Sequence, residues 1–425
     1  MASRMTALWD WIDSRMPTLG EEYRKHLSEY YAPKNFNFWY YFGSLALLVL
    51  VIQIVSGIFL TMNYKPDAAL AFGSVEYIMR DVSGGWIIRY IHSTGASAFF
   101  IVVYLHMFRG LLYGSHRQPR ELVWIFGMLI YLSLMAEAFF GYLLPWGQMS
   151  YWGAQVIVNL FNAIPFIGPD VSLWIRGDYV VSDATLNRFF AFHVIAIPLV
   201  LLALVVVHLL ALHDVGSNNP DGIEIKKKKD ANGRPLDGIP FHPYYTVKDI
   251  VGVVVFLAIF AFVVFFVPNG GGHFLESNNF LPANPLQTPP EIAPVWYFTP
   301  YYSILRAVPP MFDSQFPGVL AMGGAVLIFF FLPWLDRSPV KSIRYRGPLF
   351  KIALTVFVVS FFVLGYLGTV PTNAWGQFGP WLGNAQRCTV IARIFGALYF
   401  LFFFLMPWYT ARDKTKPVPE RVTMH

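Results

Sequence analysis

The sequence predicts an all-α integral membrane protein with eight transmembrane helices. Hydrophobic residues make up 56% of the 425 residues, aromatic residues 18% and charged residues only 13%, and the mean hydropathy is +0.49. Soluble domains carry about 25% charged residues, so this composition excludes an ordinary soluble globular protein. Apolar runs of about 18 residues or more, which suffice to cross a hydrocarbon core of about 30 Å, follow one another along the chain.

Eight such runs define the predicted helices. They cover residues 40–62, 87–113, 122–144, 187–213, 248–267, 317–335, 348–367 and 389–409. The first four, within 40–213, are expected to form a four-helix bundle. The predicted organisation is completed by an N-terminal segment 1–39, a loop 214–247, a second helical part 248–409 with a long loop 268–316, and a tail 410–425.

Positive charge is distributed unevenly between the two sides of the predicted membrane. Of the 31 Lys and Arg residues, 23 lie in the N-terminal segment, the connections after the second, fourth and sixth helices, and the tail. Because basic loops stay on the cytoplasmic side, both termini are predicted to be cytoplasmic. The run Lys226–Lys229 is interpreted as part of this topology signal rather than as a lipid-headgroup or nucleic-acid site.

The N-terminus and the cysteine content narrow the chemistry further. "MASRMTALWDWIDSRMP" lacks the apolar core of a signal peptide and is typical of an interfacial amphipathic helix. Cys388 is the only cysteine. A single thiol excludes a disulfide framework, a CxxCH haem attachment and a cysteine-ligated iron-sulfur cluster within this chain.

Two of the predicted helices each carry a pair of histidines. His92 and His106 are fourteen residues apart, and His193 and His208 are fifteen apart. In an α-helix these intervals span about 21 and 22 Å and return to within about 40° and 60° of the same face. Both helices run inward, so the four rings are expected at two matched depths. Pro198 lies in the longer interval, where a kink or widened turn could absorb the extra residue.

Four intramembrane histidines at matched depths favour metal ligation. A lone one would more often be a hydrogen-bonded packing residue or a member of a proton relay. Neutral imidazole is a good iron ligand, and two rings closing on one iron suit a six-coordinate haem inside a helical bundle. We expect His92 and His193 to hold an outer haem iron, and His106 and His208 an inner one. Such iron has no free coordination position, so it would pass electrons.

Glycines and arginines with related spacing accompany the histidines. Gly43 and Gly57 in the first helix, and Gly127 and Gly141 in the third, are also fourteen residues apart. Glycine gives backbone clearance for a haem plane, although small residues also serve ordinary helix packing. Three arginines could pair with haem propionates or simply lie at the interface: Arg89, Arg109 and Arg188.

At this point the sequence resembles a known family. The histidines, the glycines and four motifs carry the resemblance: "LPWGQMSYWGA" (144–154), "GSNNPDG" (216–222), "PFHPYYTVKD" (240–249) and "PVWYFTPYYSILR" (294–306). They are similar to cytochrome b of the bacterial ubiquinol-cytochrome c oxidoreductase (the cytochrome bc complex, respiratory complex III). Related photosynthetic complexes divide these helices between two chains, whereas here all eight are continuous. Residues 368–425 carry no motif that we could match.

The resemblance implies both an activity and an assembly. Two non-covalent b-type haems would carry electrons from ubiquinol, oxidised at an outer site, to quinone, reduced at an inner site, and so contribute to the proton gradient (Q cycle). It also implies a Rieske iron-sulfur protein and cytochrome c1 as partners, a homodimeric complex, and the bacterial inner membrane. On residue types alone, a proton-coupled transporter with a histidine relay and a haem-bearing anchor of a dehydrogenase stay open as alternatives.

The resemblance places the outer quinol site in the loop 268–316 and beside it. Candidate residues there are Pro294, Trp296 and Tyr297 of "PVWY", together with Tyr142, Gly153, Phe298 and Tyr302. Many relatives have a glutamate where this chain has Val295, which cannot accept a proton. Glu291, four residues earlier, is the expected substitute, with Tyr297 as a hydrogen-bonding partner. A solvated loop glutamate is the alternative.

The inner quinone site is expected near the end of the fourth helix. In the resembling family a histidine and a carboxylate flank the quinone, and His213 and Asp249 match them. Both side chains can donate or relay the two protons that quinone reduction requires. Ser217 and Lys248 are further candidates, with a loop-turn hydroxyl and an interfacial charge as the alternative interpretations.

Overall fold

The protein is a bundle of long helices with almost no sheet. The computed structural model describes residues 2–23, 25, 29–290, 292–311, 313–369 and 385–424. Within these residues, seven helices are long and apolar enough to cross a membrane. Cys388–Phe404 and Met406–Arg412 pass the same test together and meet at a bend of 58°, so the number of candidate spans is eight if this bent pair counts as one. The predicted class, an all-α multi-pass membrane protein, is therefore confirmed.

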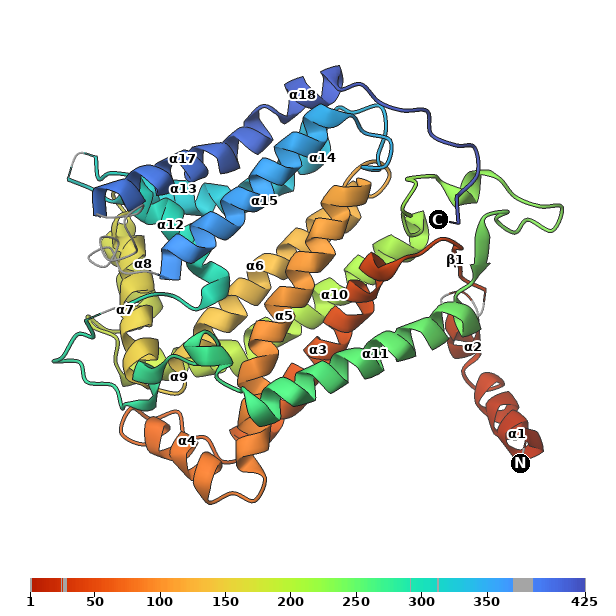
Figure 1. Ribbon diagram of the computed structural model, residues 1–425. Helices are drawn as coiled ribbons and strands as arrows, with labels where there is room; N and C mark the ends of the chain where they lie inside the picture. The colour runs from red at the N-terminus through yellow and green to blue at the C-terminus, as the bar shows by residue number, and fades with distance from the viewer. Residues whose placement is uncertain are drawn as a thin grey trace.

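The first four spans form one bundle. Their helices are α3 (Tyr41–Thr61), α5 (Gly85–Tyr113), α6 (Glu121–Leu143) and a composite of α9 (Asp183–Ala191), η3 (Phe192–Ala196) and α10 (Ile197–Val215). Helix α3 packs along α5, and α6 packs along α10. The bundle thus consists of two helix pairs whose long axes run side by side (Figure 1).

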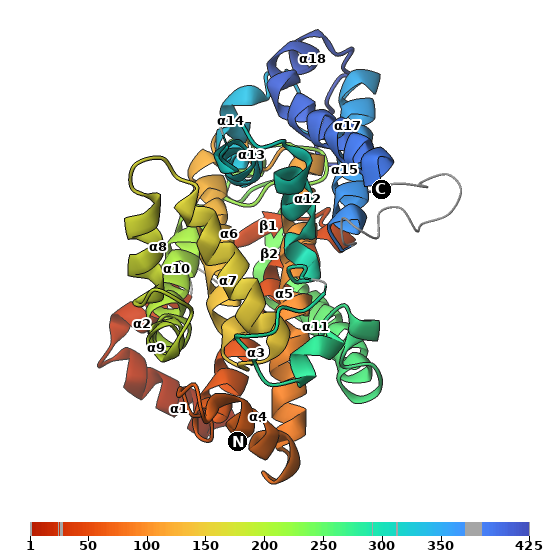
Figure 2. The same cartoon turned by 90° about the vertical axis from the view of Figure 1, so that its left-hand side faces the viewer.

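The later helices pack on two sides of this bundle (Figures 1 and 2). Helix α11 (Phe241–Phe266) lies against α5 and α3. The other elements group around α12 and are α12 (Thr299–Ala307), α13 (Phe316–Leu327), η8 (Ile328–Phe331), α14 (Leu332–Leu335), α15 (Pro348–Thr369), α17 (Ala385–Phe404) and α18 (Met406–Arg412). A single large hydrophobic core joins this group to the four-helix bundle.

Shorter elements close the two ends of the molecule. One end carries α4 (Ala71–Arg80), α7 (Gln148–Asn162), α8 (Gly168–Arg176), η5 (Gly270–Gly272) and η6 (Ser277–Phe280). The short helix η7 (Trp296–Phe298) lies farther inside, against Phe100 and Tyr104 in the middle of α5. Elements associated with the N-terminal segment and the loop after α10 are α1 (Ala2–Asp13), α2 (Pro17–Tyr23), β1 (Tyr31–Pro33), η2 (Phe38–Tyr40), η4 (Ile225–Lys227) and β2 (Gly238–Pro240).

Direct contacts bring the N-terminal segment, the loop after α10 and the tail to the same end. Strand β1 pairs antiparallel with β2, so that Ala32 is opposite Ile239. In the tail, Arg421 Nε donates to Asp237 Oδ2 at 2.8 Å, and the Thr423 backbone N–H donates to Asp221 Oδ2 at 2.7 Å. These three segments carry many of the Lys and Arg residues of the chain. Their position at one end is consistent with the single basic side that the sequence predicts.

The outer surface of the helices is apolar. Leu199 on α10, Ile259 on α11 and Phe362 on α15 are each about 60–70% exposed. Backbone polar groups are paired inside helices, and apolar side chains cover them, which is the arrangement that hydrocarbon requires. The exposed apolar surface is therefore the lipid-facing surface of a multi-pass membrane protein.

Candidate functional site

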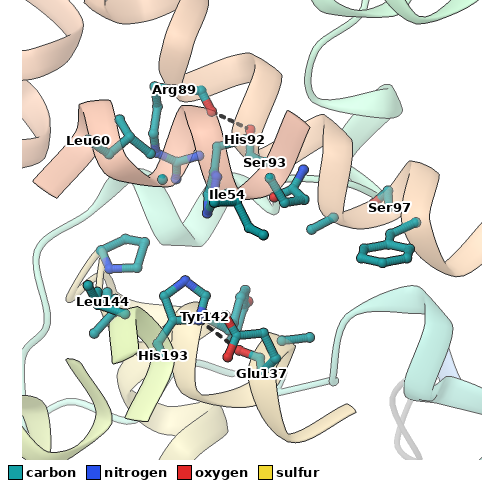
Figure 3. A pocket seen from close by; sticks show the side chains of 18 of the residues that line it. Ile54, Leu60, Arg89, His92, Ser93, Ser97, Glu137, Tyr142, Leu144 and His193 are labelled. Carbon is teal, nitrogen blue, oxygen red and sulfur yellow. Dashed lines mark hydrogen bonds and ion pairs between the residues drawn. The ribbon is translucent and has the colours of Figure 1, made fainter. Parts of the chain in front are cut away.

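The four predicted ligand histidines form two facing pairs. The ring centres of His92 and His193 are 6.0 Å apart, with the rings inclined at 89°, and those of His106 and His208 are 6.4 Å apart at 65°. With metal–nitrogen bonds of about 2 Å, and about 1 Å from nitrogen to ring centre, two imidazoles on one metal ion have centres about 6 Å apart. Both pairs therefore fit one axially ligated iron each (Figure 3 shows the outer pair).

A π-helical turn brings His193 into line with His208. Phe192–Ala196 forms a π-helix, and the Ile197 N–H bonds to the Phe192 carbonyl five residues earlier. A π-turn accommodates one extra residue inside an α-helix. It lies just before Pro198 and absorbs the fifteenth residue of the interval. Of the two possibilities that the sequence left open, a kink or a widened turn, the structure shows the widened turn.

The four spaced glycines each lie directly opposite one of these histidines. A Cβ placed on each glycine would approach the Cε1 atom of the facing imidazole. The distances are 3.4 Å for Gly43 to His106, 3.2 Å for Gly57 to His92, 3.3 Å for Gly127 to His208 and 2.3 Å for Gly141 to His193. The sequence led us to expect that these glycines leave room for a haem plane. In the structure, the missing side chains leave room for the imidazole rings themselves.

Hydrogen bonds leave Nε2 of both outer histidines available as the ligand atom. His193 Nδ1 lies 3.0 Å from the Glu137 carbonyl oxygen, which can only accept, so Nδ1 carries the proton. His92 Nδ1 lies 2.9 Å from Ser56 Oγ. That hydroxyl already donates to the Ile52 carbonyl at 2.7 Å, so it accepts from His92. Partners of this kind fix the tautomer of a metal-binding histidine.

Each histidine pair lines its own cavity. The outer cavity, of about 270 Å³, is also lined by Arg89, Val295 and Tyr297. The inner cavity, of about 610 Å³, is lined by the inner pair, Arg109 and all four predicted inner-site residues, which are His213, Ser217, Lys248 and Asp249. Each space beside a histidine pair is thus continuous with residues proposed for one quinone site. Arg188 lines neither cavity and instead donates to the Trp174 carbonyl.

Aromatic stacking and hydrogen bonds hold the "PVWY" segment against α5. The Tyr297 ring stacks on Phe100 with centres 3.8 Å apart at 8°, and the Tyr104 hydroxyl donates to the Tyr297 carbonyl at 2.6 Å. Trp296 Nε1 donates to Ser97 Oγ at 3.0 Å. The rings of Phe298 and Tyr297 pack in a T shape, with centres 4.7 Å apart at 76°. The segment therefore forms one wall of the outer cavity, with Val295 and Tyr297 as its lining residues.

The remaining outer candidates differ in their distance from the cavity. Tyr142 lines it, and a Cβ on Gly153 would lie 3.5 Å from Tyr142 Cε1. Tyr302 does not line it, and instead its ring lies under the Arg306 guanidinium at 4.5 Å. Pro294 immediately precedes the lining residue Val295. Glu291 lies outside the described residues.

Sequence reasoning missed a carboxylate at the outer site. The Tyr142 hydroxyl donates to Glu276 Oε2 at 2.9 Å, across a separation of 134 residues. Burial raises the pKa of the Glu276 carboxyl, and the hydrogen bond from Tyr142 only partly opposes this. Glu276, Glu291 and Asp313 are the acidic residues of the loop 268–316. The sequence thus offered three candidate carboxylates in this loop, but it could not show which of them contacts Tyr142, a residue that lines the outer cavity.

Sequence reasoning also missed an aromatic residue at the inner site. The Tyr30 ring stacks on His213 with centres 4.5 Å apart at 15°, and its hydroxyl lies 3.1 Å from Ser217 Oγ. Burial raises the pKa of Tyr30, with Ser217 opposing the shift, so the phenol stays neutral. The Lys248 ammonium lies 5.4 Å from the Tyr245 ring centre. The pairing of β1 with β2 brings Tyr30 to this cavity.

The fold and the two sites define a class of protein, namely a multi-pass helical membrane protein whose four-helix bundle holds two stacked bis-imidazole sites. Comparison with known proteins agrees with this class. The family model "Cytochrome b/b6/petB" matches residues 27–216, and "Cytochrome b(C-terminal)/b6/petD" matches residues 282–400. The chain belongs to the cytochrome b family.

Relatives match the chain along nearly its whole length. It is 65% identical to a cytochrome b of Allochromatium vinosum, with 100% of both chains covered. It is 50% identical to that of Rhodospirillum rubrum, covering 97% of this chain and 95% of the relative. A solved chain of "Hyperthermophilic respiratory Complex III" superposes with a TM-score of 0.84 at 43% identity, covering 95% of this chain and 98% of that one. The resemblance to bacterial cytochrome b of complex III is confirmed.

Proposed function

We propose that this chain is the di-haem, quinol-oxidising subunit of a quinol-cytochrome c oxidoreductase. It oxidises ubiquinol at the outer cavity and reduces quinone at the inner cavity, and so contributes to the proton gradient by a Q cycle. The observation that carries this proposal is that two pairs of facing imidazoles lie at two depths. Each pair lines a cavity that is also lined by residues proposed for one quinone site.

The chain's own residues would hold the cofactors. His92 and His193 would ligate the outer haem iron, and His106 and His208 the inner one. Arg89 and Arg109 line the outer and inner cavities, where they can pair with propionates. When bound, two b-type haems supply one-electron carriers between the two quinone sites.

At the outer site, the protein must bind quinol, exclude water and accept protons. Val295 and Tyr297 offer an apolar wall beside the cavity. Val295 cannot take a proton, so we assign that role to Glu276, which is connected to the cavity through the Tyr142 hydroxyl. Its raised pKa suits a base that works near neutral pH. The Glu291 assignment stays a prediction.

At the inner site, the protein must supply protons to a reduced quinone. His213 and Asp249 line the same cavity and can deliver them. Tyr30 holds the His213 ring by stacking, Ser217 offers a hydroxyl, and Lys248 can stabilise negative charge on the quinone.

We infer the assembly and the location from the similarity to a complex III chain. It supports a Rieske iron-sulfur protein and cytochrome c1 as partners, a homodimer, and the bacterial inner membrane. The basic segments gathered at one end support cytoplasmic termini. A transporter would need no haem, and a dehydrogenase anchor would need only one quinone site, so two lined cavities favour the oxidoreductase.

A reduced-minus-oxidised absorption spectrum with haem quantification tests the proposal. We expect two b-type haems per chain, and in His208→Ala we expect loss of the inner haem alone. Absence of haem from the wild-type protein would refute the function. Retention of both haems in His208→Ala would refute the ligand assignment.

A further inference from the structure

The two histidine pairs differ in one charged contact. His193 Nδ1 lies 3.0 Å from Glu137 Oε1, in addition to its 3.0 Å contact with the carbonyl of the same residue. At His92 the corresponding partner is the neutral hydroxyl of Ser56. Among the described residues, Nδ1 of His106 and of His208 has no side-chain hydrogen-bond partner. Within the part of the chain that the structure describes, a carboxylate therefore contacts only one of the four predicted ligands.

Glu137 is placed for this contact by the helix that carries it. It lies on α6 one turn before Gly141, whose missing Cβ lets the His193 ring approach the α6 backbone. Figure 3 shows Glu137 beside His193 at the edge of the outer cavity. Its second oxygen, Oε2, is buried without a hydrogen-bond partner among the described residues. A carboxylate inside a membrane protein is costly and is expected to serve a function.

The other charges around the cavities reinforce this difference. Apart from histidines, the charged residues lining the outer cavity are Arg89 and Glu137, which offset each other. The inner cavity is lined by Arg109, Lys248 and Asp249, and by Arg120, which Glu224 neutralises through a bidentate pair. With Arg120 neutralised, and with Lys248 and Asp249 of opposite charge, the inner cavity keeps the positive charge of Arg109. In the outer cavity Glu137 offsets the charge of Arg89, so Glu137 makes the outer cavity less positive than the inner one.

We propose that Glu137 is a positioning residue that lowers the reduction potential of the outer haem relative to the inner haem. Its carboxylate accepts from His193 Nδ1–H, holds Nε2 toward the iron and increases electron donation by the imidazole. Hydrogen bonds to the distal nitrogen of a ligating histidine raise its basicity, and this stabilises the more positive, oxidised iron. A lower outer potential favours inward electron transfer against the membrane potential. The proposal rests on the di-haem function proposed above.

Redox titration of the two haems in the purified protein tests this inference. In Glu137→Gln we expect the oxidised-to-reduced ratio of the outer haem to fall about tenfold at a fixed ambient potential. For a one-electron couple this corresponds to about 59 mV. The ratio for the inner haem should not change. An unchanged outer potential with both haems retained would overturn the proposal, whereas absence of both haems from the wild type would overturn the function instead.

Two further variants separate charge from structure. Ser56→Ala removes a neutral hydrogen bond from the other ligand of the same haem, so its shift should be clearly smaller than that of Glu137→Gln. An equal shift in Ser56→Ala and Glu137→Gln would show that the charge of the Glu137 carboxylate does not set the potential of the outer haem. If Glu137→Gln loses the outer haem, Glu137→Asp serves instead, because it retains the charge at a greater distance from His193. This variant should raise the reduction potential of the outer haem by less than about 59 mV. No rise in that variant would also overturn the proposal.

Discussion

Gly141 on α6 and His193 on the facing helix approach so closely that a Cβ on residue 141 would lie 2.3 Å from His193 Cε1. No real Cβ tolerates such a distance, so any side chain here must displace the imidazole or the helix. The π-turn at Phe192–Ala196 sets the position of His193 on the opposite side of this contact. The outer ligand site therefore depends on a local helix distortion and a missing side chain together.

Gly141→Ala should abolish or severely weaken the outer haem site. The added methyl group overpacks the contact, at a cost of about 1–3 kcal/mol, and turns His193 away from His92. Haem quantification should give about one b haem per chain, with the inner spectrum retained. Gly43→Ala is the matched control, because its Cβ would lie 3.4 Å from His106 Cε1, at the edge of ordinary contact. Equal haem loss in both variants would contradict this explanation.

Glu276→Gln should slow quinol oxidation about 100-fold or more at saturating quinol, because it removes the proposed proton acceptor. Burial raises the pKa of Glu276, and a base must be deprotonated to act. The wild-type rate should therefore fall as the pH drops through a pKa above the ordinary glutamate range, and this acid limb should disappear in the variant. Steady-state rates between pH 5 and 9 measure both effects.

Glu291→Gln distinguishes the two carboxylates of the outer loop. If Glu276 is the acceptor, this variant should keep the wild-type rate and pH profile. Tyr142→Phe breaks the hydrogen bond to Glu276 and should reproduce part of the Glu276→Gln loss. A slow Glu291→Gln variant beside a normal Glu276→Gln variant would restore the assignment made from the sequence.

Tyr30→Leu should slow quinone reduction at the inner site while quinol oxidation at the outer site stays normal. The substitution removes the stacked ring that orders His213 and the hydroxyl beside Ser217. Tyr30→Phe keeps the stacking and isolates the contribution of the hydroxyl. Reduction of the inner haem by quinol through the inner site, measured with the outer site inhibited, reports the effect. An unaltered rate in Tyr30→Leu would remove Tyr30 from the inner site.

Asp336→Asn should destabilise the protein by about 3–5 kcal/mol, because it leaves the Arg346 guanidinium buried without a counter-ion. Burial alone would raise the pKa of Asp336, but Arg346 and His116 outweigh it and hold the pKa well below its ordinary value. The ion pair therefore contributes stability above the unfolded-state pKa of about 4, and this is lost as the pH falls below it.

Thermal unfolding in detergent at pH 7 measures the loss in Asp336→Asn. Glu420→Gln is the control, because its pair with Lys228 is solvent-exposed, so its loss should hardly change the stability. A similar change in both variants would show that burial of the Asp336 network does not determine its contribution.

The sequence by itself determined the membrane class, the approximate spans and the spacing of the histidines and glycines. These are periodic, local properties, because helix rise and twist convert an interval of fourteen residues into depth and facing direction. The extra residue before His208 was visible as well. Whether a kink or a wider turn absorbs it depends on packing, and the structure shows a π-helix at Phe192–Ala196.

Only the tertiary structure decided which polar side chains meet at the sites. Glu276 reaches Tyr142 across 134 residues, Glu137 reaches His193 across 56, and Tyr30 reaches His213 because β1 pairs with β2. Arg188, in contrast, contacts the Trp174 carbonyl rather than a cavity. No periodic pattern encodes such contacts, because they depend on how loops and helix ends pack once the spans have assembled.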